Sequence, residues 1–246
     1  MPVNRIVEDL KGLGIRSPDF VMAHVSMRKV GGRAEDLVEA LLTVLHPDGT
    51  LLSYVDFEES DDIPFIDPSH SPACRDYGIF PEIVRRHPNS IRSLNPGASV
   101  CAIGKQAKWL CADHPNEYGY GINSPFHKLV EKDGKVLLLG SDWDQVTLLH
   151  YAEHLADIPG KRVVRPTYDL LIDGVKSRLT VEEFDTGDPV RSDMPPDYFR
   201  QIVSDFIATG TVIEGIVGGA ESWLLPAADL VAIAVEKIER EFGDTR

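Results

Sequence analysis

The chain has 246 residues, and its 25 Lys and Arg against 39 Asp and Glu give a formal net charge of −14. This length suits one large α/β domain or two small ones, and the acidic charge repels nucleic acid and favours cationic ligands. No apolar run approaches the roughly 18 residues that span a bilayer, and three cysteines without C-x-x-C spacing predict a cytoplasmic protein with neither a disulfide framework nor a zinc site.

Hydrophobic periodicity predicts helices and strands that alternate along most of the chain. In chain order, the first half is predicted to contain a helix at 3–12, a strand at 20–24, a helix at 33–45, a strand at 50–55, a long irregular segment at 56–78, a helix at 80–86, a strand at 98–103 and a helix at 105–111. The second half is predicted to contain helices at 124–132, 145–156, 197–209 and 227–242, and strands at 135–139, 162–172, 175–182, 211–216 and 221–225. This order predicts a single layered α/β/α domain over residues 1–246, with a mixed central sheet and late β-hairpins.

The helix at 145–156 carries the clearest candidate for acid–base chemistry. Helical spacing places Thr147, His150, Tyr151 and His154 on one stripe, and Glu153 lies three residues from His150. A carboxylate beside an imidazole stabilises the imidazolium that forms when a proton is taken, which is the arrangement of a general base. A solvated His–Glu pair on a helix surface is the alternative. The placement of the helix raises the functional interpretation, because the helix follows a buried strand and open sheets bind ligands at the carboxyl ends of their strands.

A second candidate site is the turn at 24–33, which leaves a buried strand and enters a helix. Gly31 and Gly32 permit a close approach of the backbone, while Arg28 and Lys29 concentrate positive charge in an acidic chain. Backbone N–H groups and these cations suit a pyrophosphate or a 3′-phosphate. The turn matches neither a P-loop nor a G-x-G-x-x-G fingerprint, so a purely structural role is the alternative.

Two groups of carboxylates stand in predicted loops or at their borders. They are Asp56, Glu58, Glu59, Asp61 and Asp62 after one strand, and Glu182, Glu183, Asp185 and Asp188 after the late hairpin. Solvated charged loops are the simple interpretation. The alternative is a clamp for a polyamine or an aminosugar, in which carboxylates accept charge-assisted hydrogen bonds from ammonium groups.

An ordered set of short motifs extends over nearly the whole chain. The motifs are H-V-S-M-R at 24–28, R-S-L-N-P at 92–96, S-P at 124–125, T-L-L-H-Y-A-E at 147–153 and F-D at 184–185. With this set the chain resembles the aminoglycoside N3-acetyltransferase family of antibiotic acetyltransferases. It departs from the usual pattern at Asn95, where many members carry His, and at Val25, where Ser or Ala is usual.

The resemblance implies acetyl-CoA as donor, without a metal, and the 3-amino group of a 2-deoxystreptamine antibiotic as acceptor. It implies that His150 is the catalytic base, supported by Asp185 or Glu153. The residues implied at the CoA site are His24, Ser26, Met27, Arg28, Lys29, Val30, Ser93, Ser99, Ser124 and Pro125. The residues implied to face the cationic antibiotic are Asp56, Glu58, Asp61, Asp62, Asp188 and Glu214. We expect a monomer or a homodimer that binds neither nucleic acid nor membranes.

Other functions remain open at this point. The chain is alternatively an acetyltransferase of the same family that acts on another small amine, or a non-catalytic CoA-binding protein. A metal-dependent hydrolase built on His150, Glu153 and His154 is disfavoured, because the sequence specifies no third ligand and the spacing matches no standard site. The donor that would stabilise an oxyanion is either a backbone N–H or Thr147.

Overall fold

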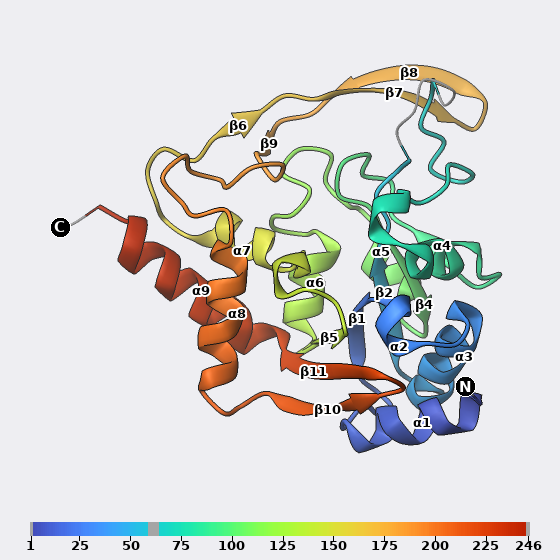
Figure 1. Cartoon of the computed structure of the whole chain (residues 1–246). Helices are drawn as coiled ribbons and strands as arrows, with labels where there is room; N and C mark the ends of the chain where they lie inside the picture. Colours follow the sequence, from blue (N-terminus) through green and yellow to red (C-terminus); the bar gives the residue numbers. More distant parts are fainter. Residues whose placement is uncertain (1, 59–63, 245–246) are drawn as a thin grey trace.

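The computed structural model describes residues 2–58 and 64–244, and its centre is a seven-stranded mixed sheet (Figure 1). The strand order across the sheet is β10-β11-β5-β1-β2-β4-β3. In that order the strands are Ile213–Val217, Ala220–Pro226, Lys135–Leu139, Phe20–Val25, Thr50–Tyr54, Val100–Gly104 and Ile91–Arg92.

The three central strands, β5, β1 and β2, run parallel, and their partners on both sides run antiparallel. Strands buried on both faces consist of continuous apolar runs, as in the sequence KVLLL of β5. The register pairs Met22 of β1 with Leu52 of β2 and with Val136 of β5. The carboxyl ends of the three parallel strands therefore meet at one edge of the sheet.

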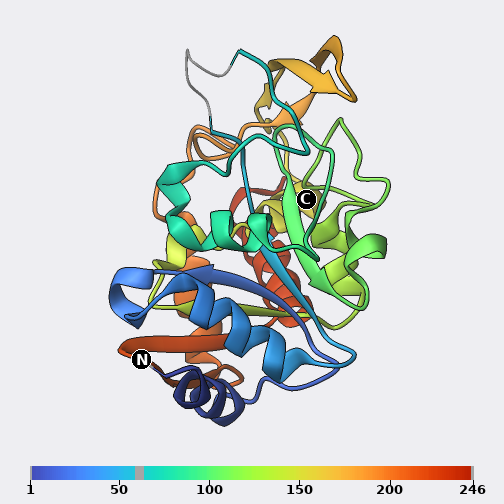
Figure 2. The same cartoon turned by 90° about the vertical axis from the view of Figure 1, so that its right-hand side faces the viewer.

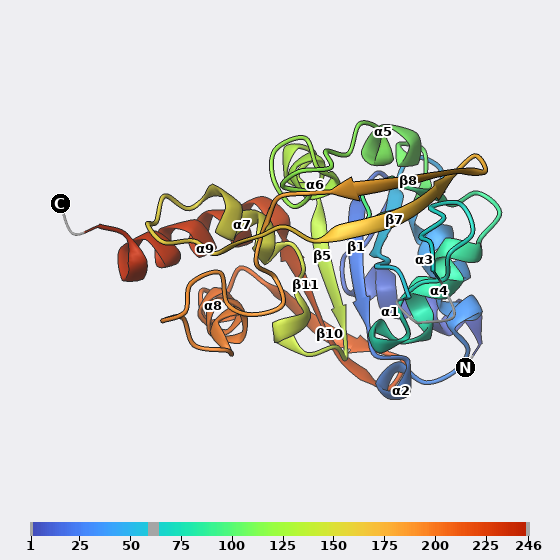
Figure 3. The same cartoon turned by 90° about the horizontal axis from the view of Figure 1, so that it is seen from above.

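Two hydrophobic cores form because successive side chains of a strand point to opposite faces. On β1, Val21 and Ala23 lie in one core while Met22 lies in the other. One face is covered by α1 (Val3–Gly12), α3 (Ala34–Leu45) and α4 (Ile79–Arg86). The other is covered by α5 (Ala107–Cys111), α6 (Pro125–Glu131), α7 (Leu149–Leu155), α8 (Tyr198–Ala208) and α9 (Ala227–Phe242). Seen from above, helices flank the sheet on both sides (Figure 3), which confirms the predicted layered α/β/α fold with a mixed sheet.

The first late hairpin, β7 (Thr167–Ile172) with β8 (Val175–Thr180), forms a two-stranded sheet of its own. It turns at Asp173 and Gly174, whose φ angles of 51° and 77° suit the left-handed turn that an Asp-Gly pair favours. A β-bridge joins Leu170 of β7 to Ile66 in the segment after β2. The hairpin and this segment thus lie together at one end of the molecule, opposite α1 (Figures 1 and 2).

The helix predicted at 145–156 is shorter than expected. A 3-10 turn, η2, covers Trp143–Gln145, and α7 begins only at Leu149, so Thr147 lies before the helix. The reason is local: the Asp142 side chain accepts from the backbone N–H of Asp144, and Arg200 of α8 pairs with both aspartates. These contacts favour a tight turn over a regular helix at these residues.

Several short elements were not predicted from the sequence. They are α2 (Met27–Val30), the 3-10 turn η1 (Arg75–Tyr77), β3 and the two-residue strand β9 (Glu183–Phe184). The strand predicted at 162–172 is divided into β6 (Val163–Val164), which pairs with β9, and β7. No helix within the described ranges has the length and apolar character needed to cross a bilayer.

Candidate active site

A cavity of about 820 Å³ opens where β5, β1 and β2 reach their carboxyl ends. The central strands, the segments that follow them, η1, α7, α8 and the β7–β8 hairpin all contribute side chains. The lining includes His24, Ser26, Met27, Arg28, Tyr54, Asp56, Asp76, Tyr77, Tyr120, Ser141, Asp142, Asp144, Thr147, His150, Tyr168 and Phe199. This position follows the rule that open α/β sheets bind ligands at the carboxyl ends of their strands.

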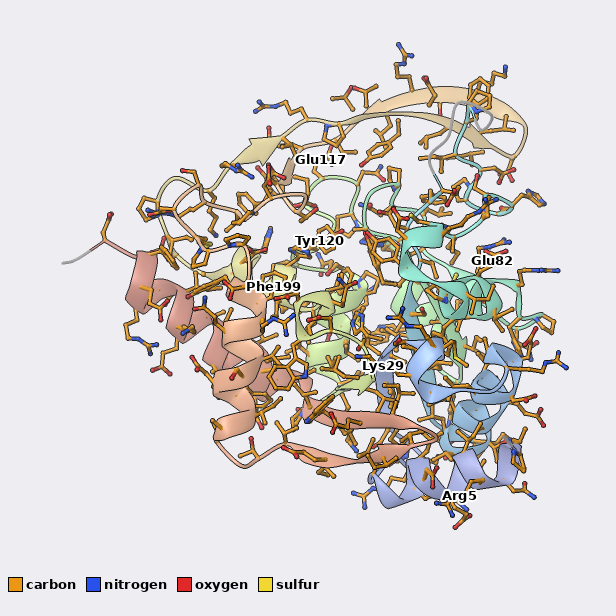
Figure 4. All side chains as sticks on the ribbon, in the orientation of Figure 1. Arg5, Lys29, Glu82, Glu117, Tyr120 and Phe199 are labelled. Atoms are coloured by element: carbon orange, nitrogen blue, oxygen red, sulfur yellow. The ribbon has the colours of Figure 1, made fainter. Side chains whose placement is uncertain are left out.

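His150 and Glu153 form a hydrogen-bonded pair on α7. Nδ1 of His150 lies 2.7 Å from Oε2 of Glu153, whose side chain is only 6% exposed. The imidazole also packs against the rings of Tyr120 and Phe199, at centroid distances of 5.0 and 4.9 Å. Figure 4 labels these two aromatic residues near the centre of the molecule. An ionised carboxylate only accepts hydrogen bonds, so with Glu153 ionised and His150 neutral, Nδ1 donates in this bond and Nε2 keeps a lone pair.

Asp185, the other carboxylate suggested as a partner of His150, instead makes an ion pair of 2.6 Å with Arg162. It also accepts hydrogen bonds from the backbone N–H groups of Gly187 and Asp188. Asp185 therefore holds a turn whose Gly187 lines the cavity. Of the two candidates, Glu153 is the one that contacts the imidazole.

Glu183 is a carboxylate near His150 that the sequence did not single out individually. Burial raises its pKa, while the backbone N–H groups of Phe184, Gly119 and Tyr120 and the charge of His150 act in the opposite direction. Its position on a two-residue strand gives no periodic signal, so no sequence pattern distinguishes it from its acidic neighbours.

The turn after β1 brings four of the proposed CoA-site residues, His24, Ser26, Met27 and Arg28, to the cavity. Burial lowers the pKa of His24 to about 4, so its imidazole is neutral near pH 7. Lys29 lies instead beside a neighbouring hollow that contains two tryptophans, Trp143 and Trp223. The remaining residue of this turn, Val30, is buried in the core.

The other proposed CoA-site residues lie inside the protein and do not line this cavity. The Ser93 hydroxyl contacts Nδ1 of His114 at 2.9 Å, and the Ser99 hydroxyl donates to the Val55 carbonyl over 2.8 Å. Ser124 caps α6 by accepting from the backbone N–H of His127, and Pro125 occupies the first turn of that helix. All three hydroxyls are thus satisfied by contacts within the fold.

The acidic residues proposed to face the acceptor are dispersed. Asp56 lines the cavity, and Glu58 pairs with Arg75. Asp188 is exposed and lines a second, adjoining cavity, which His150 also lines. Glu214 is exposed on the edge strand β10 and lines neither of these two cavities. Asp61 and Asp62 lie outside the described residues.

The cavity has further lining residues that sequence reasoning did not identify. Asp142 and Asp144 follow the apolar strand β5 directly, a position that predicts a ligand site, but both pair with Arg200. Tyr54 and Tyr77 meet edge to face with centroids 5.2 Å apart. Within residues 2–58 and 64–244, no cluster of three or more His, Cys, Asp or Glu is arranged to hold a metal ion.

Comparisons with known proteins agree on one family. The family model described as aminoglycoside 3-N-acetyltransferase matches residues 22–239. An aminoglycoside N(3)-acetyltransferase III from Pseudomonas aeruginosa is 40% identical over 98% of this chain and 94% of its own length. An aminoglycoside N(3)-acetyltransferase VII from Streptomyces paromomycinus is 36% identical over 98% and 93%.

Solved structures give the same result. The structure of AAC-IIIb in a binary complex with CoASH superposes with a TM-score of 0.96 and 40% identity, covering 100% of this chain and 99% of that one. Sisomicin-bound AAC-VIa superposes with a TM-score of 0.93 and 35% identity, covering 98% and 99%. A chain with this sheet, this cavity and these relatives belongs to the aminoglycoside 3-N-acetyltransferase family of acyltransferases.

Proposed function

We propose that this chain transfers the acetyl group of acetyl-CoA to the 3-amino group of a 2-deoxystreptamine aminoglycoside, with His150 as the general base. The main support is the His150–Glu153 pair, which lies at a cavity that also contains several carboxylates. Relatives bind one ligand of each kind, since AAC-IIIb was solved with CoASH and AAC-VIa with sisomicin.

The pair supplies the proton transfers that the reaction needs. An aminoglycoside amine is mostly protonated near neutral pH, and Nε2 of His150 takes the ammonium proton. The nitrogen then bonds to the acetyl carbon while the carbon–sulfur bond breaks, and its second proton passes to the sulfur, which leaves as a thiol. The buried Glu153 carboxylate stabilises the imidazolium until His150 gives its proton to solvent.

The wall formed by β1 and the turn after β5 fits the amide-rich arm of acetyl-CoA. Nε2 of His24 and Oγ of Ser141 are buried there without a hydrogen-bond partner among the described residues. An unsatisfied buried polar atom costs about 1–3 kcal/mol, and a ligand amide removes that cost. Arg28 in the same wall adds a cation suited to a phosphate.

A thiol-release assay with acetyl-CoA and a panel of aminoglycosides tests the proposal. We expect free thiol in proportion to an acetylated product whose modified nitrogen is the 3-amino group by NMR. Thiol release with other small amines but with no aminoglycoside would identify a different acceptor. If acetyl-CoA binds but no amine releases thiol, the chain is a CoA-binding protein and the proposal is wrong.

A further inference from the structure

Tyr54 and Tyr120 connect to Asp56 through a chain of hydrogen bonds in the cavity wall. The Tyr54 hydroxyl donates to Oδ2 of Asp56 over 3.1 Å, and the two phenol oxygens lie 2.9 Å apart. The Tyr120 hydroxyl also reaches the carbonyl of Gly97 over 3.1 Å. The two rings are buried, although all three side chains belong to residues that line the cavity.

Counting protons gives this chain of hydrogen bonds a direction. Each phenol carries one proton, and an ionised Asp56 only accepts. Tyr54 gives its proton to Asp56, so a proton between the two phenols can come only from Tyr120, whose single proton is shared with the Gly97 carbonyl. Burial, with the nearby Asp56 charge, raises the pKa of both tyrosines, which keeps the two hydroxyls protonated at any pH near neutral.

Tyr120 also touches the residue proposed as the base. Its ring stacks on Phe126 with centroids 5.2 Å apart, and it also packs against the His150 imidazole with centroids 5.0 Å apart. The segment between α5 and α6 that carries Tyr120 therefore meets α7 through the ring and β2 through the hydroxyl. The ring and the hydroxyl of this one side chain have separate contacts.

We propose that the hydroxyls of Tyr54 and Tyr120 are positioning groups that fix Asp56 as the carboxylate receiving an ammonium group of the acceptor. The inference rests on the proposed function, because it takes the acceptor to be a polyamine bound in this cavity. A hydrogen bond from a phenol fixes the orientation of a carboxylate before the ligand binds. Less side-chain entropy is therefore lost when an ammonium group contacts that carboxylate. The tyrosine hydroxyls act on acceptor affinity and not on the chemical step.

Single hydroxyl deletions separate these roles. Tyr54→Phe and Tyr120→Phe each keep the ring and remove one link of the chain, and Asp56→Asn removes its charged end. Tyr118→Phe is the matched control, because it removes a phenol-to-carboxylate hydrogen bond, to Glu182, outside this cavity. The measurements are the Kd of sisomicin by calorimetry, kcat and KM for both substrates, and thermal melts of each variant.

We expect Tyr54→Phe to weaken sisomicin binding by up to about tenfold, the size of the entropy cost of ordering one free side chain, and Tyr120→Phe to weaken it less, because Tyr120 reaches Asp56 only through Tyr54. The expected kcat and acetyl-CoA KM match the wild type and the control. Because both deletions act through Asp56, neither should weaken binding further in an Asp56→Asn background.

Unchanged sisomicin affinity in both tyrosine variants, or a fall in kcat without a change in Kd, would overturn the inference while leaving the proposed function intact. An equal loss in Tyr118→Phe would also overturn it, since the effect would then not depend on Asp56. A wild-type protein that binds no aminoglycoside overturns the proposed function itself, and the inference with it.

Discussion

The imidazole of His150 has one nitrogen committed to Glu153 and the other available for chemistry. General base assistance contributes on the order of 10²- to 10⁴-fold in rate. We therefore expect His150→Ala to lower kcat by about that factor while the Kd of CoA stays the same. Glu153→Gln keeps a hydrogen-bonding group but removes the charge, so its loss should be smaller. Single-turnover kinetics on both variants would decide the matter, and an unchanged kcat in His150→Ala would rule out the base assignment.

His114 is a buried histidine with no part in the proposed chemistry. Its two ring nitrogens contact the Ser93 hydroxyl and the Gly119 carbonyl, and burial lowers its pKa from 6.5 to about 4. As the pH falls below 6.5, this histidine takes up a proton in the unfolded chain. In the folded protein it stays neutral until about pH 4. The free energy of unfolding should therefore fall over this window, by on the order of 3 kcal/mol from this residue.

Denaturant titrations at several values between pH 7 and pH 4 would measure this fall. His114→Gln cannot titrate there, so we expect it to show a shallower dependence on pH than the wild type. Identical slopes for the two proteins would contradict the role given to His114.

The sequence identified the His150–Glu153 pair because helical spacing alone brings residues i and i+3 together. It could not show that Ser93 and Ser99 point into the fold, because the partners of a serine hydroxyl are set by tertiary contacts. The same holds for Tyr54 and Tyr120, whose residues are 66 positions apart in the chain. Local spacing thus predicted a pair on one helix and missed a chain of hydrogen bonds between distant segments.

Among the helices, α6 gives a direct test of one proposed CoA contact. Ser124 accepts a hydrogen bond from the His127 backbone N–H at the start of this helix and does not line the cavity. We expect Ser124→Ala to lower the free energy of unfolding by about 1 kcal/mol, as the loss of an N-cap does. The KM for acetyl-CoA should not change. A raised KM for acetyl-CoA with an unchanged free energy of unfolding would instead indicate that Ser124 contacts the donor.

The segment after β2 is anchored by one guanidinium. Arg92 donates to the carbonyls of Val55 and Ser71 and to the Ser99 hydroxyl, and it lies 3.6 Å from the Phe57 ring centroid. A lysine ammonium cannot match this fork of donors. We expect Arg92→Lys to raise the KM for the aminoglycoside several-fold, since Asp56 is next to the anchor, with little change in the KM for acetyl-CoA. Parallel changes in the two KM values would contradict this.

Elements with a strong local signal were predicted well. The Asp173-Gly174 turn and the final helix Ala227–Phe242 lie where the pattern placed them. The predicted start of α7 was wrong, because Arg200, which is distant in the sequence, pairs with Asp142 and Asp144 and stabilises the turn before the helix. Strands of two residues, such as β3, carry too few side chains to produce any period.

At the scale of the whole molecule, the net charge of −14 acts on the two substrates in opposite ways. Attraction between exposed charges is screened as salt shortens the Debye length from about 10 Å at 0.1 M towards 3 Å at 1 M. We expect kcat/KM for a polycationic aminoglycoside to fall several-fold between 50 and 500 mM salt, roughly as steered association does. The KM for the anionic acetyl-CoA should not rise in the same series. A salt dependence that weakens the use of both substrates alike would argue against electrostatic steering of the aminoglycoside.

The order of strands in the sheet also determines when the cavity can form. β5 lies between β1, which is more than 100 residues earlier, and β11, which is about 85 residues later. On a growing polypeptide, β5 therefore lacks its β11 neighbour until the ribosome has released β11. In the same way, α7 lacks its packing partner α9 until that helix has been made. Pairings of such long range form slowly, and the nascent chain is most exposed to aggregation in that interval. Catalytic competence is consequently acquired only after β11 and α9 have been synthesised.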